Sequence, residues 1–313
     1  MAKYRENLPQ LNGDLFLTDG GIETTLIFNE GLDLPYFAAF DLLKHAAGQA
    51  ALRKYFQSYS AIARKFSVGL ILESATWRAS SDWGEKLGYS HDELAAANRQ
   101  AMAILHEVRR EYETEQTPMV ISGCIGPRGD GYNPASFMSE AEAEYYHGMQ
   151  TKLFRDADTD LVTAMTMTYP EEAIGIVRAG QSVGMPVVIS FTVETDGRLP
   201  NGQSLRDAIA QVDRVTGNAP AYYMINCAHP SHFADRFDDG APWLTRIRGL
   251  RANASTKSHK ELDEATSLDA GDPADLANRY RALMTQLTNL NVVGGCCGTD
   301  QRHIEAICRA VRS

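Results

Sequence analysis

Short apolar runs recur along the chain and alternate with longer segments of helical periodicity. Each run is almost continuously apolar, as expected for a strand that is buried on both faces. Strands are therefore predicted at residues 15–18, 68–73, 119–122, 160–166, 186–191, 222–227, 247–253 and 290–294. This pattern favours a parallel sheet covered by helices.

The segments between these runs carry helix signals. In 41–66, apolar residues recur three and four positions apart, which places them on one face of a helix. Ser90 with Glu93, and Ser139 with Glu142, have the spacing of a capping box. Helices are predicted at residues 41–66, 90–108, 139–156, 170–183, 204–215, 273–287 and 300–311.

Eight strand–helix units over 313 residues predict a (β/α)8 TIM-like barrel, with a single domain spanning 1–313. An open, doubly wound sheet is the alternative. The seventh unit is the least regular, because 253–271 is polar and is expected to be a long loop whose length suits a lid. The Gly- and Pro-rich stretch 123–134 is predicted to form a loop over the end of the third strand.

Composition narrows the class of protein. Apolar residues make up 44% of the chain and charged residues 22%, which is typical of a globular protein. No apolar run approaches the roughly 20 residues of a membrane span, and no secretory signal opens the chain, so a cytoplasmic location is expected. The net charge of −10 and the lack of clustered Lys and Arg argue against nucleic-acid binding.

Five cysteines are present, and in the cytoplasm they are expected to be reduced. Their odd number and irregular spacing favour thiolate chemistry or metal binding over structural disulfides. Cys308 falls on the apolar face of the last predicted helix and is interpreted as a core residue, and the same interpretation is given to Cys124.

The remaining three cysteines follow two predicted strands. Cys227 ends the sixth run, and Cys296 and Cys297 follow the eighth between glycines. Strand ends converge on one face of a barrel, so these thiolates are expected to surround one tetrahedral metal with an open fourth position, best matched by catalytic zinc. A vicinal redox pair would leave Cys227 without a role. A phosphate site in the glycine-rich loop would leave the cysteines unexplained.

Other strand ends add polar groups to the same face. Asp19 ends the first run, and Gly20 and Gly21 allow a ligand to approach the backbone. Asp19 either binds a substrate ammonium or caps a turn. Glu73 and Thr76 follow the second strand, and both are assigned to substrate binding.

Two aromatic residues also follow predicted strands. Trp77 comes after the second strand and Tyr169 after the fourth. Aromatic faces bind sulfonium and quaternary ammonium groups, so this pair is predicted either to cage a cationic methyl donor or to be part of the core. His229 and His232 are interpreted as a solvated helix start and are left out of the metal site.

Three motifs together resemble the homocysteine S-methyltransferase family. They are the Asp-Gly-Gly motif in 17–21, the Asn-Cys motif in 225–227 and the Gly-Gly-Cys-Cys-Gly motif in 294–298. The resemblance covers nearly the whole chain and implies a (β/α)8 barrel. It also implies that zinc is bound by Cys227, Cys296 and Cys297, and that Asp19, its glycines and Asn226 belong to the substrate site.

One position departs from the family pattern. The family carries a Phe-Glu-Thr-like segment after the fourth strand, whose glutamate binds the amino group of homocysteine. Here the matching residues are 164–166, with Met165 in place of that glutamate. The lost charge-assisted contact is worth about 1.5–3 kcal/mol. Either another thiol is the acceptor, or Glu23 or Glu73 compensates.

By this resemblance, the protein transfers a methyl group from S-methylmethionine or S-adenosylmethionine to homocysteine, giving methionine. Zinc would deprotonate the acceptor thiol. A betaine-type donor, a different thiol acceptor and a non-catalytic barrel that binds zinc or a thiol are the alternatives. Hydrolysis by zinc-bound water fits an all-thiolate site less well. The partners are small molecules, with homo-oligomerisation left open.

Overall fold

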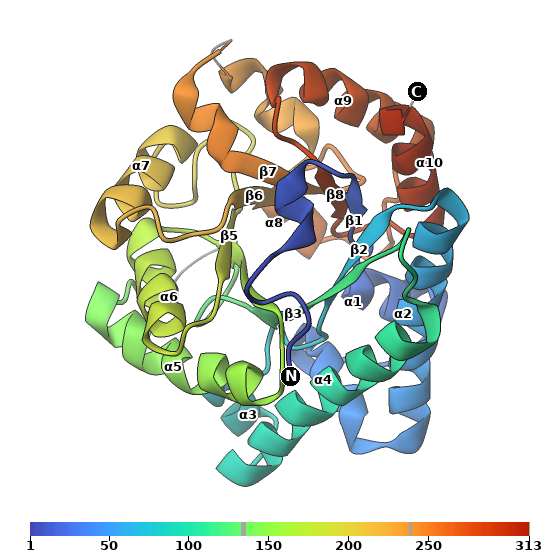
Figure 1. The fold of residues 1–313 in the computed structure, drawn as a ribbon, viewed down its shortest axis with the longest axis vertical. Helices are drawn as coiled ribbons and strands as arrows, with labels where there is room; N and C mark the ends of the chain where they lie inside the picture. Colours follow the sequence, from blue (N-terminus) through green and yellow to red (C-terminus); the bar gives the residue numbers. More distant parts are fainter. Residues whose placement is uncertain (133–135, 238–239, 313) are drawn as a thin grey trace.

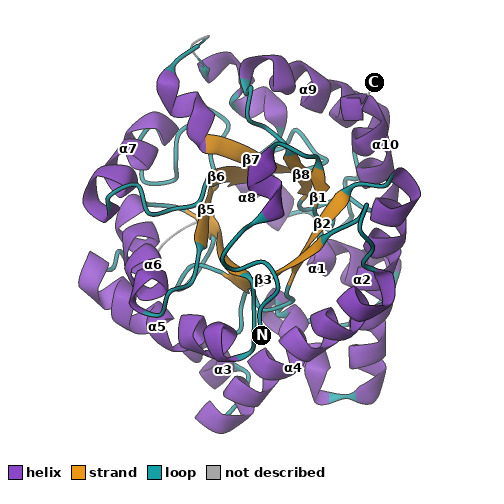
Figure 2. Cartoon of the chain, viewed as in Figure 1, coloured by secondary structure: helices purple, strands orange, loops and turns teal. Residues whose placement is uncertain are grey.

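Eight parallel strands close into a barrel, and helices form a ring around it (Figures 1 and 2). The computed structural model describes residues 1–132, 136–237 and 240–312. The strands follow one another around the barrel in chain order, and β1 pairs with both β2 and β8. The predicted (β/α)8 architecture is confirmed.

The strands lie where the apolar runs predict them. All are buried between the barrel interior and the surrounding helices, which explains why they are apolar on both faces. They are β1 Phe16–Leu17, β2 Gly69–Glu73, β3 Met119–Ile125, β4 Leu161–Met167, β5 Val187–Phe191, β6 Tyr223–Asn226, β7 Ile247–Ala252 and β8 Val292–Gly295.

The predicted capping boxes at Ser90 and Ser139 are both formed, and Ser258 makes a third. The α-helices are α1 Ile22–Thr24, α2 Ala46–Phe66, α3 Ser81–Lys86, α4 His91–Tyr112, α5 Glu140–Asp156, α6 Pro170–Ser182, α7 Leu205–Thr216, α8 His259–Asp263, α9 Pro273–Gln286 and α10 Gln301–Arg312. Shorter helical turns are the π-turn Thr25–Asn29 and the 3-10 turns Pro9–Asn12, Pro35–Phe37, Ala39–Lys44, Pro230–His232, Ala234–Arg236 and Pro242–Arg246.

The helix predicted over 41–66 is divided in two. A 3-10 turn ends at Lys44, His45 is extended, and α2 begins at Ala46. The backbone of Gly48 packs against the carbonyl of Leu42, where a side chain would collide. Apolar spacing persists across this break, because both pieces bury the same side of the chain. Helices α1, α3 and α8 were not predicted, since each is too short to show a period.

The interior of the barrel is filled at its N-terminal end. Leu8 packs with Phe16, Ile71, Val120 and inward-facing residues of the other strands. The N-terminal segment that carries Leu8 crosses this end of the barrel, and it is dark blue in Figure 1. The opposite, C-terminal end is therefore left to form a cavity. Among the described residues, no helix has the length and apolar character needed to cross a membrane.

Asp160, at the start of β4, anchors this closed end. Its carboxylate accepts hydrogen bonds from the backbone N–H groups of Tyr4 and Ile121, at 2.8 and 2.9 Å. It also pairs with Arg109 of α4 at 2.6 Å, and its side chain is fully buried. One carboxylate thus joins the N-terminal segment, β3 and α4.

We expect Asp160→Asn to lower the free energy of unfolding by about 3 kcal/mol, because it leaves the Arg109 charge buried without its counter-ion. Urea unfolding measures this change. The matched control is Asp275→Asn, which breaks the exposed pair with Arg279 and should cost less than about 0.5 kcal/mol. Equal effects of the two substitutions would contradict the anchoring role.

Candidate metal centre and substrate cavity

A cavity of about 550 Å³ opens at the C-terminal end of the barrel. Strand ends supply its floor and walls, including Asp19, Glu73, Met165, Arg251 and the three clustered cysteines. Residues of the loop predicted over 253–271 complete the lining, namely His259, Leu262, Ala265, Ser267, Leu268 and Asp269. That loop, which contains α8, therefore lies against the site.

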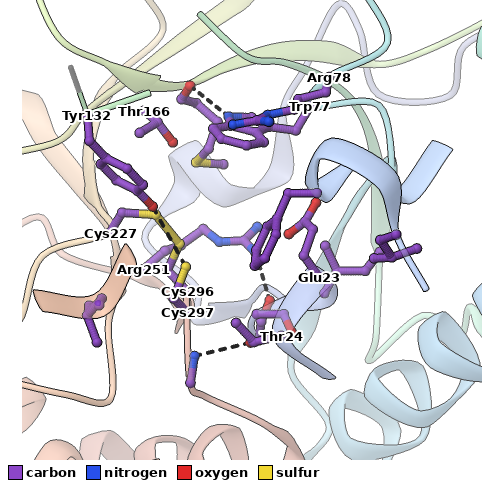
Figure 3. A pocket seen from close by; sticks show the side chains of 18 of the residues that line it. Glu23, Thr24, Trp77, Arg78, Tyr132, Thr166, Cys227, Arg251, Cys296 and Cys297 are labelled. Atoms are coloured by element: carbon purple, nitrogen blue, oxygen red, sulfur yellow. Dashed lines mark hydrogen bonds between the residues drawn. A yellow bond between two sulfur atoms is a disulfide. The ribbon is translucent and has the colours of Figure 1, made fainter. Parts of the chain in front are cut away.

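Cys227, Cys296 and Cys297 meet at this cavity (Figure 3). Cys227 follows β6 and the other two follow β8, with only β7 between them. The three sulfur atoms lie within 4.8 Å of one another. Among the described residues, the group that could hold a metal ion consists of these three cysteines.

Two of these cysteines are joined in the structure. Cys227 and Cys296 form a disulfide with their Cα atoms 5.4 Å apart, while Cys297 is a free thiol. The expectation that all five cysteines are reduced is therefore wrong for this pair. The ends of β6 and β8, on either side of β7, bring the two Cα atoms within disulfide range. Because metal binding requires thiolates, the disulfide and a metal-bound state are alternatives for the same two sulfurs.

The cysteine cluster fits a zinc ion. Zinc–sulfur bonds of about 2.3 Å place tetrahedral sulfur ligands roughly 3.8 Å apart, and the sulfurs here are already within 4.8 Å. Burial, with a further contribution from Glu23, raises the pKa of the Cys297 thiol to about 11. A buried thiolate at this position therefore needs a cation to stabilise it, which a zinc ion would provide.

The backbone at Cys227 is held in an unusual conformation. Its φ of 54° lies in the left-handed region, which is disfavoured for a residue with a side chain. The Cys227 N–H donates to the Arg251 carbonyl, and its own carbonyl accepts from Asn253 Nδ2 and His259 Nε2, at 3.0 and 2.6 Å. These three contacts fix the direction of the sulfur.

Tyr132 and His259 extend this support to Cys297. The two rings lie against each other with their centroids 4.2 Å apart and their planes tilted by 31°, and the Tyr132 hydroxyl lies 3.8 Å from the Cys297 sulfur. Tyr132 comes from the loop predicted over 123–134, where β3 runs on to Ile125 before the loop begins. Pro134 lies outside the described residues. Sequence reasoning missed both rings, since neither stands in a motif.

A bulge in β4 shapes another wall. The register between β4 and β5 shifts between Ala164 and Met167, and Thr166 has a φ of 65°. Asn226 stabilises this bulge, because its Oδ1 accepts from the Thr166 N–H at 2.9 Å and its Nδ2 donates to Thr166 Oγ1 at 2.8 Å. Met165 and Thr166 consequently line the cavity, with Asn226 buried behind them.

The residues predicted to bind substrate fall into two groups, those that line the cavity and those that lie outside its described lining. Asp19, Gly20, Gly21, Glu73 and Met165 line the cavity, whereas Thr76 and Asn226 are absent from its described lining. Thr76 is fully buried, and its hydroxyl donates to the Cys124 carbonyl at 2.7 Å. Direct substrate contact by Thr76 and Asn226 stays a prediction.

Gly20 and Gly21 have a packing role that explains the motif. A Cβ at Gly20 would lie 2.8 Å from the carbonyl oxygen of Thr299, and one at Gly21 would lie 2.6 Å from the Cys296 carbonyl oxygen. The Gly21 N–H also donates to the Thr299 carbonyl at 3.1 Å. Side chains at these positions would push the turn after β1 away from the cysteine turn after β8.

The predicted aromatic pair is separated. Trp77 lines the cavity, and its Nε1 donates to the Met165 carbonyl at 3.4 Å. Tyr169 is buried outside the described lining, where its ring packs edge-on against Phe137. Of the two alternatives for this pair, a cage or the core, the structure favours the core for Tyr169, which is 2% exposed.

A buried ion pair crosses the cavity floor. Arg251 of β7 pairs with Asp19 at 2.6 Å, and its Nε and Nη2 donate to the carbonyls of Gly295 and Gly20. Burial disfavours the charged guanidinium, but Asp19 and Glu73 outweigh this and raise the pKa of Arg251. Sequence reasoning missed Arg251, although a charged residue inside an apolar strand was a usable signal.

Two carboxyl groups of the cavity have pKa values raised to near 7. Burial raises the pKa of Glu73 to about 7, although Arg251, Ser122 and Thr163 act against it. Burial also raises the pKa of Glu23 to about 7, and Asp19 adds to this increase. The cavity can therefore change its charge near neutral pH.

The fold and the site together define a (β/α)8 barrel with a cysteine cluster in the cavity at its C-terminal face. A family model described as homocysteine S-methyltransferase matches residues 16–311. The chain belongs to the homocysteine S-methyltransferase family and is a thiol methyltransferase. It is 23% identical to homocysteine S-methyltransferase 4 of Zea mays, over 96% of this chain and 90% of that protein.

Solved structures show the same fold. The homocysteine methyltransferase MmuM from Escherichia coli in its metallated form is 18% identical, with a TM-score of 0.72 and 96% of each chain covered. The oxidized form of MmuM is 17% identical, with a TM-score of 0.73 and coverage of 98% of this chain and 99% of that one. At this level of identity the likeness establishes the barrel, not the substrate.

The pKa of Glu73 predicts a pH effect on stability. Because folding raises this pKa from 4.5 to about 7, the stabilising contribution is complete below pH 4.5 and is lost as the pH rises through 7. In the wild type, the free energy of unfolding should therefore fall by about 3 kcal/mol more over this pH range than in Glu73→Gln, which has no carboxyl group to titrate. Urea unfolding at about pH 5 and about pH 8 covers most of the interval over which this stability is lost. Exposed Glu115→Gln is the control, and parallel profiles for wild type and Glu73→Gln would refute the assignment.

Proposed function

We propose that this chain, as one barrel domain, is a zinc-dependent S-methyltransferase that moves a methyl group from a sulfonium donor to homocysteine, giving methionine. The observation that carries the proposal is the convergence of three cysteine sulfurs at the cavity, within 4.8 Å of one another. The family membership supplies the reaction class. S-methylmethionine and S-adenosylmethionine are the donors proposed, and the cytoplasm, where thiols stay reduced, is the location proposed.

Cys227, Cys296 and Cys297 would hold the metal. When bound, zinc would lower the pKa of a coordinated thiol, so that the acceptor reacts as a thiolate at neutral pH. The protein fixes this ligand set through the strained backbone of Cys227 and through the Tyr132 hydroxyl beside Cys297. The packed glycines at 20 and 21 keep the turn after β1 against the cysteine turn.

The cavity favours a cationic methyl donor. Its described lining holds five carboxylate residues, Asp19, Glu23, Glu73, Asp130 and Asp269, against two arginines, Arg78 and Arg251. This excess of acidic groups attracts positive charge. The rings of Phe28, Tyr36, Phe37, Trp77 and Tyr132 also line the cavity and offer faces to a sulfonium.

Methyl transfer from such a donor needs no general base once the acceptor is a thiolate. A bond forms between the acceptor sulfur and the methyl carbon, and the bond from that carbon to the donor sulfur breaks with its electron pair. The sulfonium charge and the thiolate charge cancel, so both products are neutral at sulfur. The protein's task is therefore to align the two sulfurs and to exclude water.

A betaine-type donor would use the same aromatic faces, and it is the second candidate donor. Hydrolysis by metal-bound water and passive zinc or thiol storage are distinguished by one experiment. Protein purified under reducing conditions is assayed for zinc and then given homocysteine and S-methylmethionine. About one zinc per chain with methionine formed supports the proposal. Zinc without methyl transfer to any thiol would contradict it.

We expect Cys297→Ala to lose zinc and to lower turnover by roughly 100-fold or more, because it removes one of the three metal ligands. Metal analysis and methionine formation measure the two effects. Cys308→Ala is the matched control, since Cys308 is buried in α10 away from the cavity and its loss should leave zinc in place. A zinc-free Cys297→Ala variant with full activity would end the metal mechanism.

We also expect Trp77→Leu to raise the KM for the methyl donor by roughly 2- to 30-fold, because it removes the aromatic face that a cation contacts. Trp77→Phe keeps an aromatic ring and should retain most of the affinity. Initial rates at saturating homocysteine separate donor KM from kcat. Equal donor KM values in wild type and Trp77→Leu would show that this ring takes no part in donor binding.

A further inference from the structure

Two buried charged residues of the cavity each present one atom without a protein partner. Among the described residues, neither Glu73 Oε2 nor Arg251 Nη1 has a hydrogen-bond partner. Both residues line the cavity, and they are only 4% and 6% exposed. Charged atoms that are buried without a partner are unfavourable and therefore point to a ligand that satisfies them.

The other atoms of these two side chains are fully engaged. Arg251 uses Nε and Nη2 on the Gly295 and Gly20 carbonyls and on Asp19. Glu73 Oε1 accepts from Thr163 Oγ1 at 2.8 Å. The protein thus holds one side of each group rigidly and leaves one donor and one acceptor free.

We infer that Arg251 and Glu73 select the methyl acceptor by its two charges: Nη1 of Arg251 binds the acceptor's carboxylate, and Oε2 of Glu73 binds its ammonium. The inference rests on the proposed function, because it places the acceptor sulfur at the three cysteines. Arg251 is then the residue that selects an acidic acceptor, and Glu73 the residue that selects an amine.

Arg251 is well placed for this role. It lies on β7, between the strands that deliver the cysteines, and its backbone carbonyl accepts from the Cys227 N–H at 3.1 Å. Its Nε contacts the carbonyl of Gly295, directly before Cys296. In Figure 3, Arg251 and the three cysteines belong to the lining of the same cavity. A short amino acid with its sulfur at the cysteines would bring its carboxylate to this group.

Glu73 supplies the negative charge that Met165 lacks. Met165 lines the cavity but offers only a thioether and methylenes, which suit the apolar part of the acceptor. Glu73 lies on β2, and its ordered oxygen is held by Thr163 of β4, two residues before Met165. Glu23 also lines the cavity, but it is less deeply buried than Glu73, and none of its atoms is among the buried polar atoms without a partner.

The test uses three acceptors with the zinc-loaded enzyme and S-methylmethionine. Homocysteine carries both charges, mercaptobutyrate lacks the ammonium, and homocysteamine lacks the carboxylate. Wild type should prefer homocysteine over each analogue in kcat/KM by roughly 10- to 100-fold, the value of one charge-assisted hydrogen bond.

Glu73→Gln should reduce the preference over mercaptobutyrate to within about 3-fold and leave the preference over homocysteamine intact. Arg251→Lys keeps a cation for Asp19 but cannot also reach outward with a second N–H, so it should lose the preference over homocysteamine alone. Zinc content and thermal unfolding confirm that both variants fold, and the exposed Glu115→Gln is the matched control.

A purely structural role for these residues would lower the rates with all three acceptors equally, and that result would overturn the inference while the proposed function stands. If wild type transfers methyl groups to none of the three, the proposed function fails. Calorimetric titration with homocysteine then decides the inference. Binding that is lost in both variants supports it, and equal binding by wild type and both variants overturns it.

Discussion

The ion pair between Arg251 and Asp19 is the interaction on which the functional end of the barrel depends. It joins β7 to the turn after β1, and the same guanidinium binds the Gly295 carbonyl just before Cys296. A buried arginine is tolerated only with a counter-ion and satisfied donors. Because Arg251 finds its counter-ion and acceptors on the ends of β1 and β8, it links these two strand ends to β7 beneath the cysteine cluster.

Other groups tune the geometry from behind the cavity wall. Asn226 stabilises the left-handed Thr166, and His259 and Asn253 stabilise the left-handed Cys227. Disfavoured backbone conformations persist only where surrounding contacts fix them. His259 belongs to the loop after β7. This loop therefore forms part of the cavity wall and also fixes the direction of Cys227, a candidate metal ligand.

Much of the fold follows from the sequence, since strands buried on both faces leave a strong apolar signal and capping boxes are local. The cysteine cluster was also predictable, because adjacent thiols between glycines are rarely used as core filling. Tyr132, His259 and the disulfide between Cys227 and Cys296 were not, because they arise from contacts between segments far apart in the chain. Asn226 was recognised from its motif, but its contact with the β4 bulge lay beyond sequence reasoning.

The sequence by itself determined the barrel, the positions of the strand ends and the residues that carry sulfur, since each depends on local composition and periodicity. Tertiary structure alone decided which of the polar residues at those ends face the cavity. Thr76 turns to the Cys124 carbonyl while Glu73 keeps one oxygen free, and Arg251 of β7 reaches the cavity floor and pairs there with Asp19. The reason is physical: closure of the barrel fixes which side of each strand end is inside, and burial then decides which charges must find a partner.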